Sequence, residues 1–138
     1  MSEYRCTWWE YTGRYSEFVG AVSSPIMRSL ETGEELSGAD LPNGALWVAG
    51  GDPDLYPKGP DGLAICCRIP GKHTWFIDGR ASNCTMKDDT EHRCWVRHGT
   101  VGELIHVDKN GNTCKAGGGS IATPGFHGFL HHGVLRDC

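Results

Sequence analysis

The stretch LAICCRIPGKHTWFID, from Leu63 to Asp78, decides which kind of fold the sequence can adopt. Two runs rich in β-branched and aromatic residues, 63–69 and 73–78, flank the short segment Pro70–Lys72. Runs of this length on either side of a turn that contains proline and glycine are typical of a β-hairpin. We therefore predict an antiparallel hairpin over these residues.

The same alternation of short β-compatible runs and compact turns continues to the C-terminus. RCWVRH (93–98) is compatible with a strand, ELIHVD (103–108) and NTCKAG (112–117) flank KNG as a hairpin, and HGFL (127–130) and VLR (134–136) flank HHG as another. The 20 glycines and 7 prolines also favour turns and short elements over long helices. We predict that the C-terminal two thirds is mostly antiparallel β.

The N-terminal segment, residues 1–43, has a less regular pattern. Its apolar residues recur at a loosely helical spacing that Pro25 interrupts, which predicts one short helix or a broken pair. Residues 32–44 are polar and rich in turn formers, so we expect a surface loop before ALWVAG (45–50) as the first strand. The predicted fold class is α+β, mostly β, with antiparallel hairpins in the C-terminal two thirds and an irregular or short-helical N-terminal segment.

Length and charge limit the class of protein. A chain of 138 residues with 38% hydrophobic content is enough for one core, so we expect a single domain, 1–138, in which a β-rich Cys/His region spans 44–138. The net charge of -4 argues against a nucleic-acid partner. The first residues lack a basic segment before an apolar core, and no apolar run reaches the roughly 18 residues of a membrane span. We expect a cytoplasmic or virion-associated protein that is not secreted by a signal peptide and has no membrane partner.

Cysteine and histidine are the residues that carry chemistry in this sequence. All 7 histidines lie between His73 and His132, and the 7 cysteines are an odd number in a chain without an export signal, which favours thiols or metal ligands over a disulfide framework. Zinc prefers thiolate and imidazole ligands. Five cysteines have no role that the pattern assigns: Cys6, Cys66, Cys67, Cys84 and Cys138. Cys66 and Cys67 are adjacent, so on a strand they face opposite sides.

The stretch EHRCWVRHG (91–99) is the densest group of candidate ligands. On an extended strand His92, Cys94 and His98 would share one face, because residues two or four apart point the same way. Cys114 and His127 follow later in the chain. The spacing is not a CxxC pair, so ordinary packing of a buried cysteine stays open as the alternative. We expect His131 and His132 to be solvated in a turn, and His106 to be an ordinary packing or surface residue.

Three segments, HRCWVRHG, ELIHVDKNGNTCKAGGGSI and GFHGFLHHGVL, resemble an uncharacterised family of small phage and bacterial proteins over residues 91–135. In that family an early Cys/His knot and a late His look like zinc ligands, which the resemblance carries onto Cys94, His98 and His127, with His92 beside them. This sequence lacks some cysteines of the more cysteine-rich family pattern, and Cys114 is the candidate replacement. The resemblance implies a metal, and it implies no reaction.

Three functions remain open at the level of the sequence. The first is a non-enzymatic, phage-encoded accessory module in which zinc crosslinks short hairpins and the aromatic segment CTWWEYTGRY (6–15) binds a protein partner or a second copy of the chain. The second is a zinc-dependent hydrolase with an open metal position, in which Glu91 or Asp89 acts as base. The third is a metal-free β domain with free thiols. We expect the first, because nearby Cys and His residues are ample and no recognised motif marks a base.

Overall fold

The computed structural model is built almost entirely of β-strands. It describes residues 2–16, 23–50, 55–79, 84–86, 88–89, 94–108, 120–123 and 125–138. In these residues twelve strands form a six-stranded, a four-stranded and a two-stranded sheet, and the one helical element is a short 3-10 helix. No helix in the described ranges is long and apolar enough to cross a membrane. The prediction of a mostly β structure is confirmed.

The largest sheet has six strands in the order β4-β3-β2-β5-β6-β7. In chain order they are β2 (Thr7–Tyr15), β3 (Pro25–Ser29), β4 (Glu35–Ser37), β5 (Ala45–Val48), β6 (Ile65–Ile69) and β7 (His73–Phe76). The hairpin predicted around PGK is confirmed, because β6 and β7 pair antiparallel and Ile69 is opposite His73. Gly71 in its turn has a φ of 91°, a conformation that glycine adopts without steric cost.

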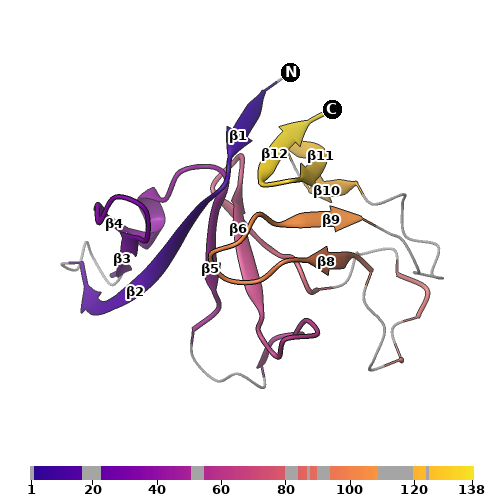
Figure 1. Ribbon diagram of the computed structural model, residues 1–138, viewed down its shortest axis with the longest axis horizontal. Helices are drawn as coiled ribbons and strands as arrows, with labels where there is room; N and C mark the ends of the chain where they lie inside the picture. The colour runs from indigo at the N-terminus through magenta and orange to yellow at the C-terminus, as the bar shows by residue number, and fades with distance from the viewer. Residues whose placement is uncertain are drawn as a thin grey trace.

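The four-stranded sheet brings the two ends of the chain together. Its order is β1-β12-β11-β10, with β1 (Glu3–Arg5), β10 (Ile121–Thr123), β11 (Phe126–His131) and β12 (Val134–Asp137). Because β1 pairs with β12, the N- and C-terminal strands lie side by side (Figure 1). The hairpin predicted at HHG is confirmed, since His131 pairs with Val134. His132 and Gly133 between them have φ of 50° and 77°, and positive φ at both central residues defines a type I′ turn.

The two-stranded sheet pairs β8 (Val96–His98) with β9 (His106–Asp108). Both strands fall within runs that the sequence predicts as strands. In the structure β9 pairs antiparallel with β8, a pairing that the sequence analysis does not predict. The hairpin predicted between 103–108 and 112–117 stays a prediction. Residues 112–117 lie outside the described part of the chain.

The prediction of a short-helical N-terminal segment is wrong, and the α+β class is replaced by an almost entirely β structure. Four strands, β1 to β4, precede the segment that the sequence analysis takes as the first strand. Trp8 and Trp9 point to opposite faces of β2 and are both buried, at 7% and 5% exposure, so this strand is covered on two sides. Pro25 begins β3, a position where its missing N–H is tolerated. The expected loop at 32–44 contains β4 and the 3-10 helix η1 (Gly38–Asp40).

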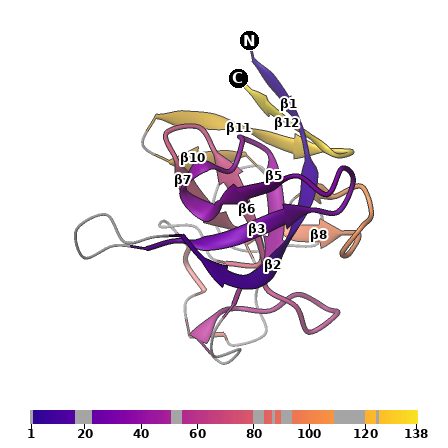
Figure 2. The ribbon, with the colours of Figure 1, turned by 90° about the vertical axis from the view of Figure 1, so that its left-hand side faces the viewer.

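Two hydrophobic cores lie on the two faces of the strands β2, β5 and β6. The main core holds Trp8, Leu46 and Cys67, and it extends to side chains from β9 to β12. The second core holds Trp9 and Cys66 with side chains from β3 and β5. Adjacent Cys66 and Cys67 therefore face opposite sides, as predicted. Figure 2 shows the strands β2 and β3 on one side of the molecule and the hairpin β11–β12 on the other.

Candidate functional site

A cluster of histidines forms where the β8–β9 pair meets the β11–β12 hairpin. On β8 and β9 the side chains alternate, so Arg97 and Val107 are buried register partners, and His98 and His106 are partners on the outer face. Asp108 is two residues beyond His106 and shares this outer face. One strand pair thus presents two imidazoles and a carboxylate to the same side.

The β11–β12 turn adds two further imidazoles to this face. The ring of His106 stacks on that of His131, with centroids 4.7 Å apart, and on that of His132, with centroids 4.3 Å apart. The ring of His98 lies 5.8 Å from that of His106. The turn is held beside β9 by the backbone N–H of Gly133, which donates to the carbonyl of Ile105 at 2.8 Å. We call these residues the histidine cluster: His98, His106, Asp108, His131 and His132.

The main electrostatic interactions in the histidine cluster involve Asp108 and His106. The Oδ2 atom of Asp108 is 3.2 Å from Nε2 of His98 and 3.7 Å from Nε2 of His106. Burial lowers the pKa of His106, and the neighbouring His132 and His131 lower it further. Nδ1 of His106 is buried without a hydrogen-bond partner. His106 is therefore the member of the cluster that favours the neutral imidazole, the form that binds metals.

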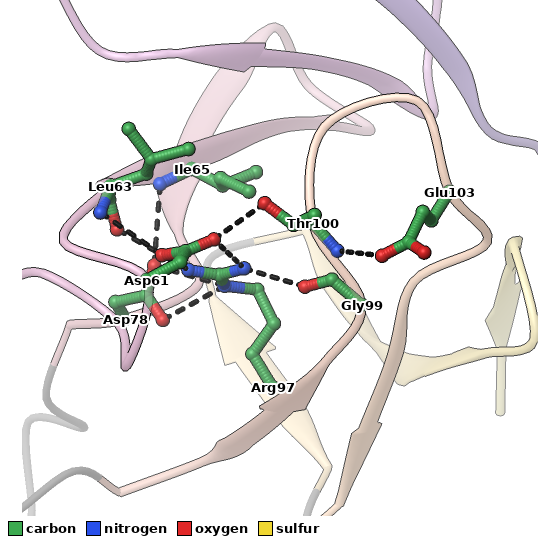
Figure 3. A network of polar contacts seen from close by, with 8 residues as sticks. All are labelled: Asp61, Leu63, Ile65, Asp78, Arg97, Gly99, Thr100 and Glu103. Carbon is green, nitrogen blue, oxygen red and sulfur yellow. Dashed lines mark hydrogen bonds and ion pairs between the residues drawn. The ribbon is translucent and has the colours of Figure 1, made fainter.

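The strand β8 that carries His98 is anchored by the guanidinium of Arg97 (Figure 3). The Arg97 side chain is 1% exposed. Its Nη2 and Nη1 atoms donate to the two carboxylate oxygens of Asp61 at 2.7 and 3.0 Å, and its Nε donates to Oδ1 of Asp78 at 3.0 Å. The hydroxyl of Thr100 donates to Asp61 at 2.6 Å, and Nη1 of Arg97 also donates to the carbonyl of Gly99 at 2.6 Å. Two-point contacts of this kind fix the orientation of a side chain.

The two carboxylates of this network have opposite pKa shifts. Hydrogen bonds from Arg97 hold the pKa of Asp61 well below its usual range, whereas burial raises the pKa of Asp78 despite its ion pair. The network also needs a residue without a side chain at Gly59, because a Cβ there would lie 2.1 Å from Nη2 of Arg97. These contacts tie β8 and its turn to the loop before β6 and to the end of β7, so they position the strand that carries His98.

The structure separates the ligands predicted from the sequence. Cys94 is in the main core at 2% exposure, whereas His98 is on the surface in the histidine cluster. The predicted shared face does not reach Cys94, because β8 begins only at Val96. His127 is exposed on β11, on the same face as His131 and four residues away. His92 and Cys114 lie outside the described residues.

Among the described residues, no three His, Cys, Asp or Glu side chains are arranged to hold a metal ion as they stand. Of the described side chains, the histidine cluster comes closest to such an arrangement. Most of its residues were not predicted as ligands from the sequence. His131 and His132 are exposed as expected, but both stack on His106, which the sequence indicates as an ordinary packing or surface residue. A signal was present in the sequence, since HHG predicts a tight turn that holds two imidazoles close together.

Comparisons with known proteins add no assignment. No model of a protein family matches the sequence, and neither a curated protein nor a solved structure matches it. The resemblance of residues 91–135 to the family of phage and bacterial proteins therefore stays a prediction. What the site can do follows from its own geometry and chemistry.

Proposed function

We propose that this protein is a small, non-enzymatic β module that binds a divalent transition metal, zinc in the first place, at the histidine cluster. The observation that carries the proposal is the ring of His106, which lies against the rings of His131 and His132 with Asp108 beside it. Imidazole nitrogens and a carboxylate oxygen are ligands that Zn²⁺ accepts in a tetrahedral shell.

Metal binding requires some of these rings to turn. The side chain of His98 is 51% exposed, and His131 and His132 are also exposed. Exposed side chains change rotamer within picoseconds to nanoseconds, so these three imidazoles can reorient around His106 at little cost. The buried and unpartnered Nδ1 of His106 is a polar atom that gains from a new partner. A shared cation would account for the gathering of four imidazoles on one face.

The bound metal would have a structural role. It would join His106 on β9 to His132 in the turn before β12, and so crosslink the two-stranded and four-stranded sheets. The histidine cluster contains four imidazoles, enough to close a tetrahedral shell with protein ligands, as structural zinc sites do. A small chain of short strands gains stability from such a crosslink. This supports the module over the zinc hydrolase with an open metal position.

Equilibrium dialysis of untagged protein against Zn²⁺, followed by metal analysis, tests this function. We expect about one equivalent of zinc in the parent protein and a loss of at least tenfold in affinity in His106→Ala and in His132→Ala. His73→Ala is the matched control, because His73 is exposed on β7 outside the cluster, and it should leave binding unchanged.

A second variant separates this site from the ligand set predicted by sequence. Cys94→Ser should retain zinc, because the thiol of Cys94 is in the main core. Zinc binding that survives in His106→Ala but disappears in Cys94→Ser would refute the histidine cluster and favour the sequence-predicted ligands. Protein that takes up no zinc at all would leave the metal-free β domain.

A further inference from the structure

A second feature of the molecule, far from the histidine cluster in the fold, is a cavity beside the second core. It measures about 300 Å³, and its lining includes Tyr11, Pro25, Met27, Leu41, Trp47 and Arg68. An adjoining cavity of about 380 Å³ shares Tyr11 and Pro25 and continues to Tyr15. No acidic side chain of the described residues lines either cavity.

Among the described residues that line the smaller cavity, the one charged side chain is that of Arg68 on β6. Arg68 is 8% exposed, and its guanidinium carbon lies 5.8 Å from the ring centre of Trp47. Its Nη2 donates to the carbonyl of Gly38 at 2.7 Å, but its Nε is buried without a hydrogen-bond partner. Within the described residues the guanidinium therefore has one hydrogen-bond acceptor, the carbonyl of Gly38, and its buried Nε has none.

Arg68 differs in this respect from the other described arginines. The exposed ones each lie within 4 Å of a glutamate, in the pairs Arg5–Glu31, Arg14–Glu35, Arg28–Glu10 and Arg136–Glu3. The other buried one, Arg97, is held by two aspartates. A buried charge is costly unless an opposite charge compensates it. Arg68 is the one described arginine that forms no ion pair with a described carboxylate, and its guanidinium lines a cavity, which points to a carboxylate from outside the chain.

We propose that this cavity binds a small aromatic carboxylate, whose carboxylate pairs with Arg68 and whose ring lies against the side chains of Tyr11 and Trp47. A guanidinium presents a planar fork of donors that matches the two oxygens of a carboxylate. The apolar side chains of Pro25, Met27 and Leu41 suit a ring, and Ser24 adds one hydroxyl to the lining. Because the whole chain carries a net charge of -4, general attraction of anions is absent and selectivity must come from this local site.

The test uses benzoate as the probe, with its neutral analogue benzamide and inorganic phosphate for comparison. Trp47 lines the cavity, so binding should change tryptophan fluorescence in a saturable way. We expect benzoate to bind, and benzamide and phosphate to bind at least tenfold more weakly. Arg68→Met should reduce the affinity for benzoate at least tenfold, and Arg136→Met, on the exposed face of β12, should not. Equal binding of benzoate and benzamide, or full affinity in Arg68→Met, would overturn the proposal.

Two further measurements keep the proposal testable if Arg68→Met folds poorly. Arg68→Lys keeps the charge and loses the planar fork, so it should retain part of the affinity for benzoate. In the parent protein, benzoate should shift the indole N–H resonance of Trp47 in NMR spectra and leave that of Trp95, which is in the main core, unchanged. Shifts confined to residues outside the cavity, or no saturable shift at millimolar benzoate, would refute the site.

Discussion

Arg97 and His98 are consecutive residues of β8, and their side chains point to opposite sides of the strand. The Arg97 side chain is 1% exposed and is bound by two aspartates, whereas the His98 side chain is 51% exposed and belongs to the histidine cluster. Because a strand alternates its side chains, the contact that fixes Arg97 also fixes the outward direction of His98. The buried ion network and the candidate metal site are thus two faces of the same short element.

Loss of the Arg97 guanidinium should strongly destabilise the fold. Arg97→Met would leave Asp78, whose side chain is 3% exposed, as a buried carboxylate without its cation. Removing one partner of a buried ion pair typically costs about 3–5 kcal/mol of unfolding free energy. Urea denaturation measures this difference, and Arg136→Met, which breaks an exposed pair with Glu3, should cost less than about 1 kcal/mol. Similar costs for the two variants would show that the Arg97 network contributes little.

The same network should make the protein sensitive to acid. Arg97 lowers the pKa of Asp61 in the folded state, so the stabilisation is fully present above the ordinary Asp value of 3.8 and is lost as the pH falls below it. We expect the free energy of unfolding to drop progressively from about pH 5 to below about pH 3, as Asp61 becomes protonated first in the unfolded and then in the folded state, and the drop to be smaller in Asp61→Asn. Asp40→Asn, an exposed change outside the network, serves as the control. An unchanged acid dependence in Asp61→Asn would assign the acid sensitivity to other carboxylates.

A methyl group added at Gly59 should disturb the hydrogen-bond network around Arg97. In Gly59→Ala the new Cβ would lie 2.1 Å from Nη2 of Arg97, so the guanidinium or the loop has to move. A Cβ at Gly62 has open space, although the positive φ of 80° there adds backbone strain of about 1–2 kcal/mol. Gly59→Ala should therefore lower the free energy of unfolding more than Gly62→Ala does. A larger loss of unfolding free energy in Gly62→Ala than in Gly59→Ala would mean that the loop before β6 moves at little cost in free energy.

The hairpins could be predicted from sequence because their signals are local. Two or three residues are enough to predict the turns at Gly71 and at His132–Gly133. The runs that flank these turns are short and β-compatible. The N-terminal strands depend on distant partners, since β2 lies beside β5 and β1 beside β12, at the opposite end of the chain. Burial of Trp8 and Trp9 on two faces follows from those partners, so the local spacing of apolar residues was misleading there.

The candidate site was predictable only in part for the same reason. His98 could be selected from its dense neighbourhood of Cys and His, but its actual neighbour, His106, is determined by the register of β8 with β9. His131 and His132 join them because β11 packs against β9, a contact without a local sequence signal. Cys94 is buried in the main core, and its role as a ligand stays a prediction because His92 and Cys114 lie outside the described residues.

The cysteines should differ widely in reactivity. Burial raises the pKa of Cys66 to about 12, and a hydrogen bond with Cys6 together with burial raises the pKa of Cys67 well above its usual range. The thiolate is the reactive form, so both should resist alkylation by iodoacetamide in the folded protein. Of the described cysteines, Cys138 is the exposed one and should react before the others, and mass spectrometry of Cys138→Ser identifies its contribution. Early modification of Cys66 or Cys67 would indicate that the sheet opens locally.

Zinc should stabilise the fold through the crosslink between β9 and the β11–β12 turn. A ligand that binds only the folded state at a concentration 100-fold above its Kd adds about 2.7 kcal/mol to the free energy of unfolding. In a double-mutant cycle with zinc present, His106→Ala and His132→Ala should each remove most of this increment, and the double variant should lose little more, because both residues hold the same ion. With a chelator in place of zinc, the coupling between the two substitutions should fall to that of the stacked rings alone. A coupling in zinc no larger than the coupling with chelator would mean that the two imidazoles do not share a metal and interact only through their own contact.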